Sequence, residues 1–275
     1  MRSVKSLIVA GMAAFLSTTA LAADMPSIMP PPMIGYAQPP IAEEFSGWYL
    51  RGDIGISQQK VKSLYNVLYE SPGISVATIG AGFDGAALFG VGVGYQFGSW
   101  FRADITGEYR AKASLHGLDI VSFNGGIIGT DEYSGSKADF LALVNLYADL
   151  GTWWCITPFI GVGVGGNYST ISSFVDVNTV NAGVAFARDE SKFSFAYAVH
   201  AGLGYKVSNS LTMELAYRYV DLGSAVSGDL RTYTGINNVN NPMHFNGITS
   251  HDVKLGVRWT CCEPPPAQPV LMHRG

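Results

Sequence analysis

Apolar and polar residues alternate with a period of two along eight segments of this chain. In residues 192–207, one face carries Phe193, Phe195, Tyr197 and Val199, while the other face carries mostly small and polar residues. Because successive side chains of a strand point to opposite faces, each segment predicts a strand with one apolar face. At about 9 to 14 residues, each is long enough to cross a bilayer at a tilt near 45°. The segments are residues 48–57, 87–97, 100–110, 138–149, 156–165, 192–207, 211–219 and 252–259.

The alternation is weakest in residues 138–149, where Leu141 and Leu143 fall on the face of Asp139. The connections between the segments alternate in length: every second one has a few residues, and the others have about 25, as in outer-membrane barrels with short periplasmic turns. The fold class predicted is therefore all-β, an eight-stranded antiparallel transmembrane β-barrel in up-and-down order with four long extracellular loops. The tryptophans lie at strand ends beside the short turns and the tails, which predicts an aromatic belt at the membrane interface. They are Trp48, Trp100, Trp153, Trp154 and Trp259.

Both ends of the chain differ from this body. Arg2 and Lys5 precede a short apolar run, and Ala20-Leu21-Ala22 supplies a small-x-small cleavage site. The run is too short to span a bilayer, so it predicts a cleaved signal peptide and export. Most of the 13 prolines flank the body. We divide the chain into a signal peptide (1–22), a Pro-rich periplasmic segment (23–45), an outer-membrane barrel (46–260) and a Pro-rich periplasmic tail (261–275).

The composition excludes several classes of protein. Only 14% of the residues are charged, and the formal charge of −4 without a Lys/Arg run gives no basic face for nucleic acid. The 33 glycines oppose a long-helix protein. No run of about 18 apolar residues follows the leader, so no transmembrane helix is predicted.

In a lipid-embedded barrel the polar face points into the lumen. Eight strands leave an interior that side chains fill, and unpaired buried charges are costly, so opposite charges are expected to pair there. The inward basic residues are Arg51, Arg102, Arg110, Lys206, Arg218, Lys254 and Arg258, and the inward acidic residues are Asp53, Asp104, Glu108, Asp139, Asp149, Glu214 and Asp252. Inward glycines of residues 87–97 and 156–165 are expected to make room for long side chains from opposite walls. We favour a plugged lumen over a selective pore, because a wide channel needs about sixteen strands.

Cysteine and histidine add weaker hints. Cys155 lies at a periplasmic turn and Cys261-Cys262 follow the last strand on the same side, so in the oxidising periplasm Cys155 can pair with Cys261 or Cys262. Three reduced thiols are an equally open alternative. No Cys/His metal spacing occurs. His116 and His244 fall in the external loops and His200 in the lumen, and no HxS pair occurs, so no catalytic, metal or cofactor-binding residue and no enzyme activity is predicted.

Three segments resemble a known family. Residues 45–55 (FSGWYLRGDIG), 157–165 (TPFIGVGVG) and 217–223 (YRYVDLG) are similar to strands of the small outer-membrane barrels of alphaproteobacteria, in the OmpA-like and opacity-type porin group. The resemblance implies an eight-stranded barrel with structural, surface-antigen or adhesive roles, and a few such relatives bind haem. One departure is the Cys-Cys and Pro-rich tail after Trp259, where barrels of this group usually end at an aromatic residue.

These observations predict a structural outer-membrane protein that supports envelope integrity and acts as a surface antigen. The alternatives are a small-solute porin and a loop-mediated binder of haem or a host surface. The expected partners are outer-membrane lipid, lipopolysaccharide, and the periplasmic chaperone and barrel-insertion machinery, with no cofactor and no nucleic acid. The ligand of the external loops is not identified by the sequence.

Overall fold

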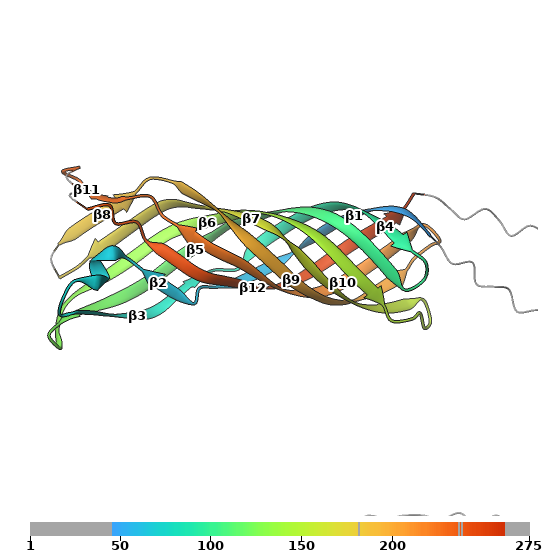
Figure 1. Ribbon diagram of the computed structural model, residues 1–275, viewed down its shortest axis with the longest axis horizontal. Helices are drawn as coiled ribbons and strands as arrows, with labels where there is room; N and C mark the ends of the chain where they lie inside the picture. The colour runs from blue at the N-terminus through green and yellow to red at the C-terminus, as the bar shows by residue number, and fades with distance from the viewer. Residues whose placement is uncertain (1–45, 181, 236, 238, 262–275) are drawn as a thin grey trace, which may run out of the picture. The chain divides into compact units, whose positions relative to one another are not determined.

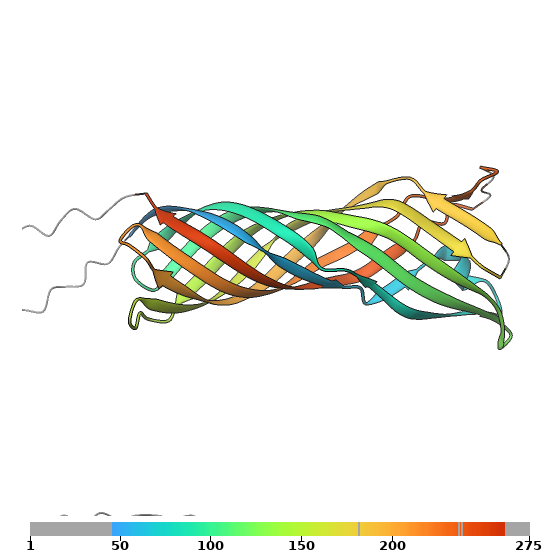
Figure 2. The ribbon, with the colours of Figure 1, turned by 180° about the vertical axis from the view of Figure 1, so that it is seen from behind.

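A closed ring of eight antiparallel strands forms the body of the protein (Figures 1 and 2). The computed structural model describes residues 46–180, 182–235, 237 and 239–261. Around the ring the order is β1, β4, β5, β6, β7, β9, β10 and β12, and pairing of β12 with β1 closes it. Their bounds are β1 Ser46–Lys60, β4 Ala86–Phe97, β5 Phe101–Phe123, β6 Gly126–Asp149, β7 Ile156–Asn178, β9 Glu190–Lys206, β10 Leu211–Val226 and β12 His244–Thr260. The eight predicted strands and the fold class are confirmed.

Four short strands and one 3₁₀ helix complete the described structure. Three of the strands pair with the ring at one end, on the left in Figure 1: β2 pairs with β12, β3 with β5 and β8 with β7. The fourth, β11, pairs with β8. They are β2 (Ser63–Tyr65), β3 (Ile74–Phe83), β8 (Gly183–Ala187) and β11 (Leu230–Thr232), and the helix is η1 (Val67–Glu70). No helix in the part of the chain that the structure describes is long and apolar enough to cross a membrane. The leader predicted for residues 1–22 and both Pro-rich segments lie outside the described residues, apart from Cys261.

The strands run much further than the sequence indicated. Residues 111–137, expected as a loop, belong to β5 and β6, which pair from Phe101 opposite Ala148 to Phe123 opposite Gly126. Asn124 and Gly125 form the tip with φ values of 49° and 84°, the left-handed pair that a tight hairpin turn requires. Register shifts between Arg110 and Ala113 interrupt the alternation there. The expected loop is therefore a long hairpin, paired along nearly all of its length.

The outer face changes character along each long strand. On β6, the outward residues Phe140, Val144 and Leu146 are exposed and apolar. Nearer the start of the strand, the outward residues Glu132 and Ser134 are exposed and polar. The change occurs next to Tyr109, Phe140 and Tyr168 on adjacent strands, and the tryptophans mark the opposite end of the apolar band. On β6 the band covers residues 140–149, about the length that a tilted strand needs to cross a hydrocarbon layer. The polar part of β5, β6 and β7 therefore stands outside it, and we call this part the external half.

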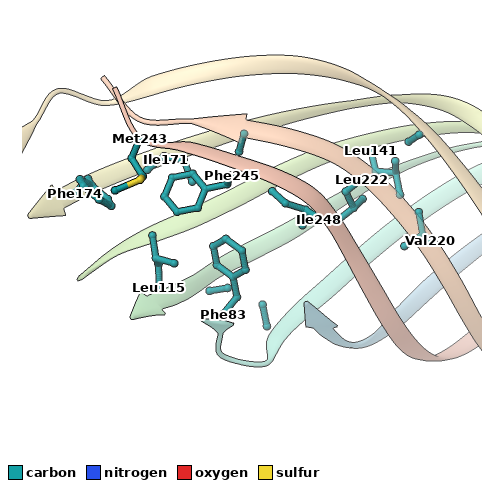
Figure 3. Packing of buried hydrophobic residues seen from close by; sticks show 14 of the residues in the cluster. Phe83, Leu115, Leu141, Ile171, Phe174, Val220, Leu222, Met243, Phe245 and Ile248 are labelled. Atoms are coloured by element: carbon teal, nitrogen blue, oxygen red, sulfur yellow. The ribbon is translucent and has the colours of Figure 1, made fainter. Parts of the chain in front are cut away.

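The inner face shows the opposite pattern: its residues are charged within the apolar band and largely apolar in the external half. On β12 the inward residues are Asp252, Lys254 and Arg258 within the apolar band, but Ile248 and Phe245 in the external half. An external apolar cluster occupies most of the interior of the external half and reaches into the apolar band through Leu141 and Leu143 (Figure 3). Its largest members are Phe83, Leu115, Tyr133, Leu141, Leu143, Ile171, Phe174, Leu222, Met243, Phe245 and Ile248. Leu141 and Leu143 disturbed the predicted alternation because they are the lumenal residues of this cluster on β6.

Candidate functional site

Eleven charged residues fill the lumen within the apolar band, and we call them the charge network. All eleven are buried, and they come from the four strands β1, β5, β10 and β12. Every one of them is in contact with an opposite charge. The residues are Arg51, Asp53, Arg102, Asp104, Glu108, Arg110, Glu214, Arg218, Asp252, Lys254 and Arg258.

One end of the charge network is centred on Glu214. Its carboxylate lies 3.3 Å from Arg51, 3.0 Å from Arg102 and 3.2 Å from Arg258. Arg51 in turn contacts Asp53 at 2.8 Å and Asp104 at 2.9 Å. Three guanidinium groups around one carboxylate are tolerable because the neighbouring carboxylates balance their charge.

The other end is centred on Glu108. Its carboxylate contacts Arg218 at 2.5 Å, Arg110 at 3.1 Å and Lys254 at 3.2 Å. Asp252 accepts from both arginines, at 2.6 Å from Arg110 and 2.7 Å from Arg218. The Lys254 ammonium also lies 3.4 Å from Asp53, so it joins the two ends into one continuous network across the lumen.

Aromatic rings close the periplasmic side of the charge network. The Arg102 guanidinium lies 4.4 Å from the ring centroid of Tyr147 and 4.6 Å from that of Phe159, a geometry in which cation–π attraction acts. The Tyr49 hydroxyl donates to Asp104 at 3.0 Å. The expectation that inward glycines make room for charged side chains from opposite walls is corrected: their neighbours lie on adjacent strands, where Gly94 faces Tyr49, Gly161 faces Tyr147 and Gly92 faces Arg51.

Replacing Gly94 with alanine is expected to lower the free energy of unfolding by about 1–3 kcal/mol, the cost of overpacking a filled interior. The added Cβ would clash with the Tyr49 ring at Cζ and lie 2.6 Å from the Ala103 carbonyl oxygen. Urea unfolding of the barrel in detergent measures the change. Gly90→Ala on the same face of β4 is the matched control, because its nearest neighbours are at 3.6 Å or more. An equal loss for both variants would contradict the steric explanation.

A second buried ion pair escaped the sequence analysis. Lys137 lies 2.5 Å from Asp139 and also donates to Gln59 at 2.8 Å, and all three side chains are buried. Ser169 donates to the same aspartate at 2.6 Å. Lys137 was missed because it fell in an expected loop, although its two-residue spacing from Asp139 was the available signal.

Two further residues were predicted to point inward. Asp149 does so and pairs with Arg102 at 3.2 Å, whereas Lys206 is exposed.

The remaining candidate residues lie near the two ends of the described structure. All five predicted tryptophans are more than half exposed. Cys155 and Cys261 are exposed free thiols, so no bond between these two is present, and Cys262 lies outside the described residues. His116 lies on β5, 3.8 Å from Asp84, and His244 lies on β12 beside Tyr65, with β4 and β1 between these strands in the ring. His200 is buried in the lumen, 3.2 Å from Asn145.

An antiparallel ring with an apolar outer band and a charged interior defines a transmembrane β-barrel, because closure leaves no unpaired strand edge in lipid. The chain belongs to the family described as outer membrane protein beta-barrel domain, whose model matches residues 10–260. The protein is therefore located in the cell outer membrane.

The chain is also similar to individual proteins. An uncharacterised protein of Brucella suis biovar 1 (strain 1330) is 31% identical over 246 residues, which cover 78% of this chain and 84% of that protein. A putative adhesin of Rickettsia bellii (strain RML369-C) is 26% identical over 174 residues, or 62% of this chain and 72% of that protein. Among solved structures, the outer membrane protein OprG from Pseudomonas aeruginosa matches with a TM-score of 0.45 and 13% identity, over 79% of this chain and 97% of that one.

Proposed function

We propose that the protein is a structural, surface-exposed outer-membrane barrel with a lumen that does not conduct solutes. The observation that carries the proposal is the double filling of the lumen. The charge network occupies the part inside the apolar band, and the external apolar cluster lies against it and extends through the part beyond the band. A solute would have to break buried ion pairs and then pass a packed apolar cluster, and both steps are costly.

The proposal includes the finer points of the sequence analysis. We assign the protein to the OmpA-like and opacity-type group, with no catalytic activity, and place the five tryptophans at the periplasmic interface of the membrane. Outer-membrane lipid and lipopolysaccharide would then contact the apolar band and the base of the external half. The periplasmic chaperones and the barrel-insertion machinery would act on the chain before it reaches the membrane.

Planar-bilayer recording of the refolded barrel tests this proposal. We expect no channel steps from protein whose folded state is verified by its shifted gel mobility without heating. Reproducible, stepwise conductance from such protein would contradict the filled lumen and favour the small-solute porin. A preparation that is folded, inserted and silent would leave the external half as the place of function.

Attachment to another surface is the second candidate, and the tips of the external half favour it. Ile127, Val180 and Tyr233 lie at three different turns of this end, with exposed fractions of 70%, 63% and 81%. Exposed apolar side chains of this kind are typical of contact sites. The Rickettsia bellii relative is named a putative adhesin.

A further inference from the structure

A cavity of about 500 Å³ opens in the external half, among η1, β3, β5, β6, β7, β8 and β11. Its volume lies in the range of small-molecule sites. Its lining includes the apolar residues Leu68, Ile128 and Met243 and the carboxylates of Asp131 and Asp176. We call it the external cavity, and neither the filled lumen nor the tips account for it.

Asp131 and Asp176 line the external cavity, and a third carboxylate, Asp119, is buried next to them. Asp119 on β5 lies directly opposite Asp131 on β6, and Asp176 on β7 lies opposite Tyr133. Like charges directly opposite each other in a sheet destabilise it. Among the described residues, none of the three aspartates forms an ion pair, although the charge network pairs its own carboxylates throughout. The acidic trio, Asp119, Asp131 and Asp176, therefore carries uncompensated negative charge.

Two acceptor atoms of the acidic trio lack a hydrogen-bond partner among the described residues, whereas Asp131 accepts from the Asn178 side chain at 2.7 Å. Asp119 is completely buried, and its Oδ2 accepts a hydrogen bond from Tyr69, which lines the cavity. The buried Oδ1 atoms of Asp119 and Asp176 and the buried Tyr133 hydroxyl have no hydrogen-bond partner among the described residues. A buried acceptor without a partner costs free energy, and native structures rarely keep such groups unless something occupies the site.

Burial and the neighbouring negative charges raise the pKa of two members of the acidic trio. Burial, together with Asp131 and Asp119, raises the pKa of Asp176 to about 7, and burial also raises the pKa of Asp131. The titratable groups that face Asp176 are these two carboxylates and the phenols of Tyr133 and Tyr69. A bound cation would displace the proton of Asp176, so binding is expected to weaken below about pH 7.

We propose that the external cavity binds an aliphatic amine with more than one ammonium group. The ammonium groups would donate to Asp131 and Asp176, the two members of the acidic trio that line the cavity, and the methylene chain would lie against Leu68, Ile128 and Met243. An ammonium fits better than a metal ion, because no group of three metal-ligating side chains within the described residues has the geometry to hold one. The apolar lining residues of the cavity also favour a ligand with a hydrocarbon body.

Calorimetric titration of the refolded full chain with 1,4-diaminobutane tests the proposal. At pH 8 we expect saturable binding that weakens at least tenfold at pH 5.5 and at least tenfold in Asp176→Asn. Asp84→Asn is the matched control, since Asp84 is an exposed external aspartate beside His116 and should bind as the parent does. Calcium ions and neutral 1,4-butanediol serve as comparison probes and are expected to bind at least tenfold more weakly.

A second measurement separates binding from folding. Without ligand, Asp176→Asn is expected to unfold at an equal or higher urea concentration than the parent, because the substitution relieves like-charge repulsion. A purely structural role for Asp176 predicts the opposite shift. The proposal is overturned if diaminobutane does not bind, if Asp176→Asn binds it unchanged, or if calcium binds at least as tightly. Conductance of the lumen has no bearing on any of these outcomes.

Discussion

Replacing Glu108 with glutamine is expected to lower the free energy of unfolding by about 3–5 kcal/mol, the cost of removing one partner from a buried ion pair. Glu108 is 2% exposed and contacts three cations, Arg110, Arg218 and Lys254. The amide cannot balance their charge, and the lumen offers them little water. Equilibrium urea unfolding in detergent, followed by tryptophan fluorescence, measures the loss.

The control for this variant is Glu132→Gln, an exposed glutamate of the external half, for which we expect a change within about 0.5 kcal/mol. Adding Arg218→Met to Glu108→Gln should recover part of the stability, because it removes one of the excess cations. If the Glu108 variant and its control unfolded at the same urea concentration, the charge network would not contribute to stability.

Replacing Phe245 with alanine is expected to cost about 3–5 kcal/mol, as for other large core residues. Phe245 is completely buried on β12, and its ring lies 6.2 Å from that of Phe83 and 6.0 Å from that of Phe174. It thus joins β3, β7 and β12 across the interior (Figure 3). The loss should concentrate in the external half, because the charge network does not depend on this ring.

Amide hydrogen exchange measures where stability is lost in this variant. Residues 113–123 of β5 are expected to lose protection, while residues 140–149 of β6 within the apolar band keep theirs, since sub-global units open separately. Ile127→Ala, at the exposed tip, should leave both segments protected. Uniform loss of protection along the barrel would mean that the two halves unfold as one unit.

The sequence predicted the membrane part of the fold because lipid outside and paired charges inside give a strict alternation. The same reasoning placed Glu108, Arg218 and Asp252 in one lumen. The external half was missed because its alternation has the opposite sign, with polar residues outward and apolar residues such as Phe245 inward. Register shifts beside Arg110 and between Ser134 and Ser136 also break the period.

The candidate sites differ in the same way. Members of the charge network are recognisable because a charge on the inner face of a membrane strand needs a partner. Lys137 and the acidic trio lie beyond the predicted strand ends, where sequence alone gives no register. That Asp119 lies opposite Asp131 follows from the hairpin tip at Asn124 and Gly125, and only the structure provides that pairing.

The inversion of polarity along each long strand also sets how deeply the barrel sits in the bilayer. A shift toward the periplasm would carry Lys112 and Ser114 into hydrocarbon, and a shift the other way would expose Tyr109 and Phe140 to water. Vertical displacement is therefore penalised in both directions. With fourteen residues of β6 beyond Phe140, the hairpin tip is held at a fixed height of about 33 Å above the membrane, from the rise per residue and the strand tilt.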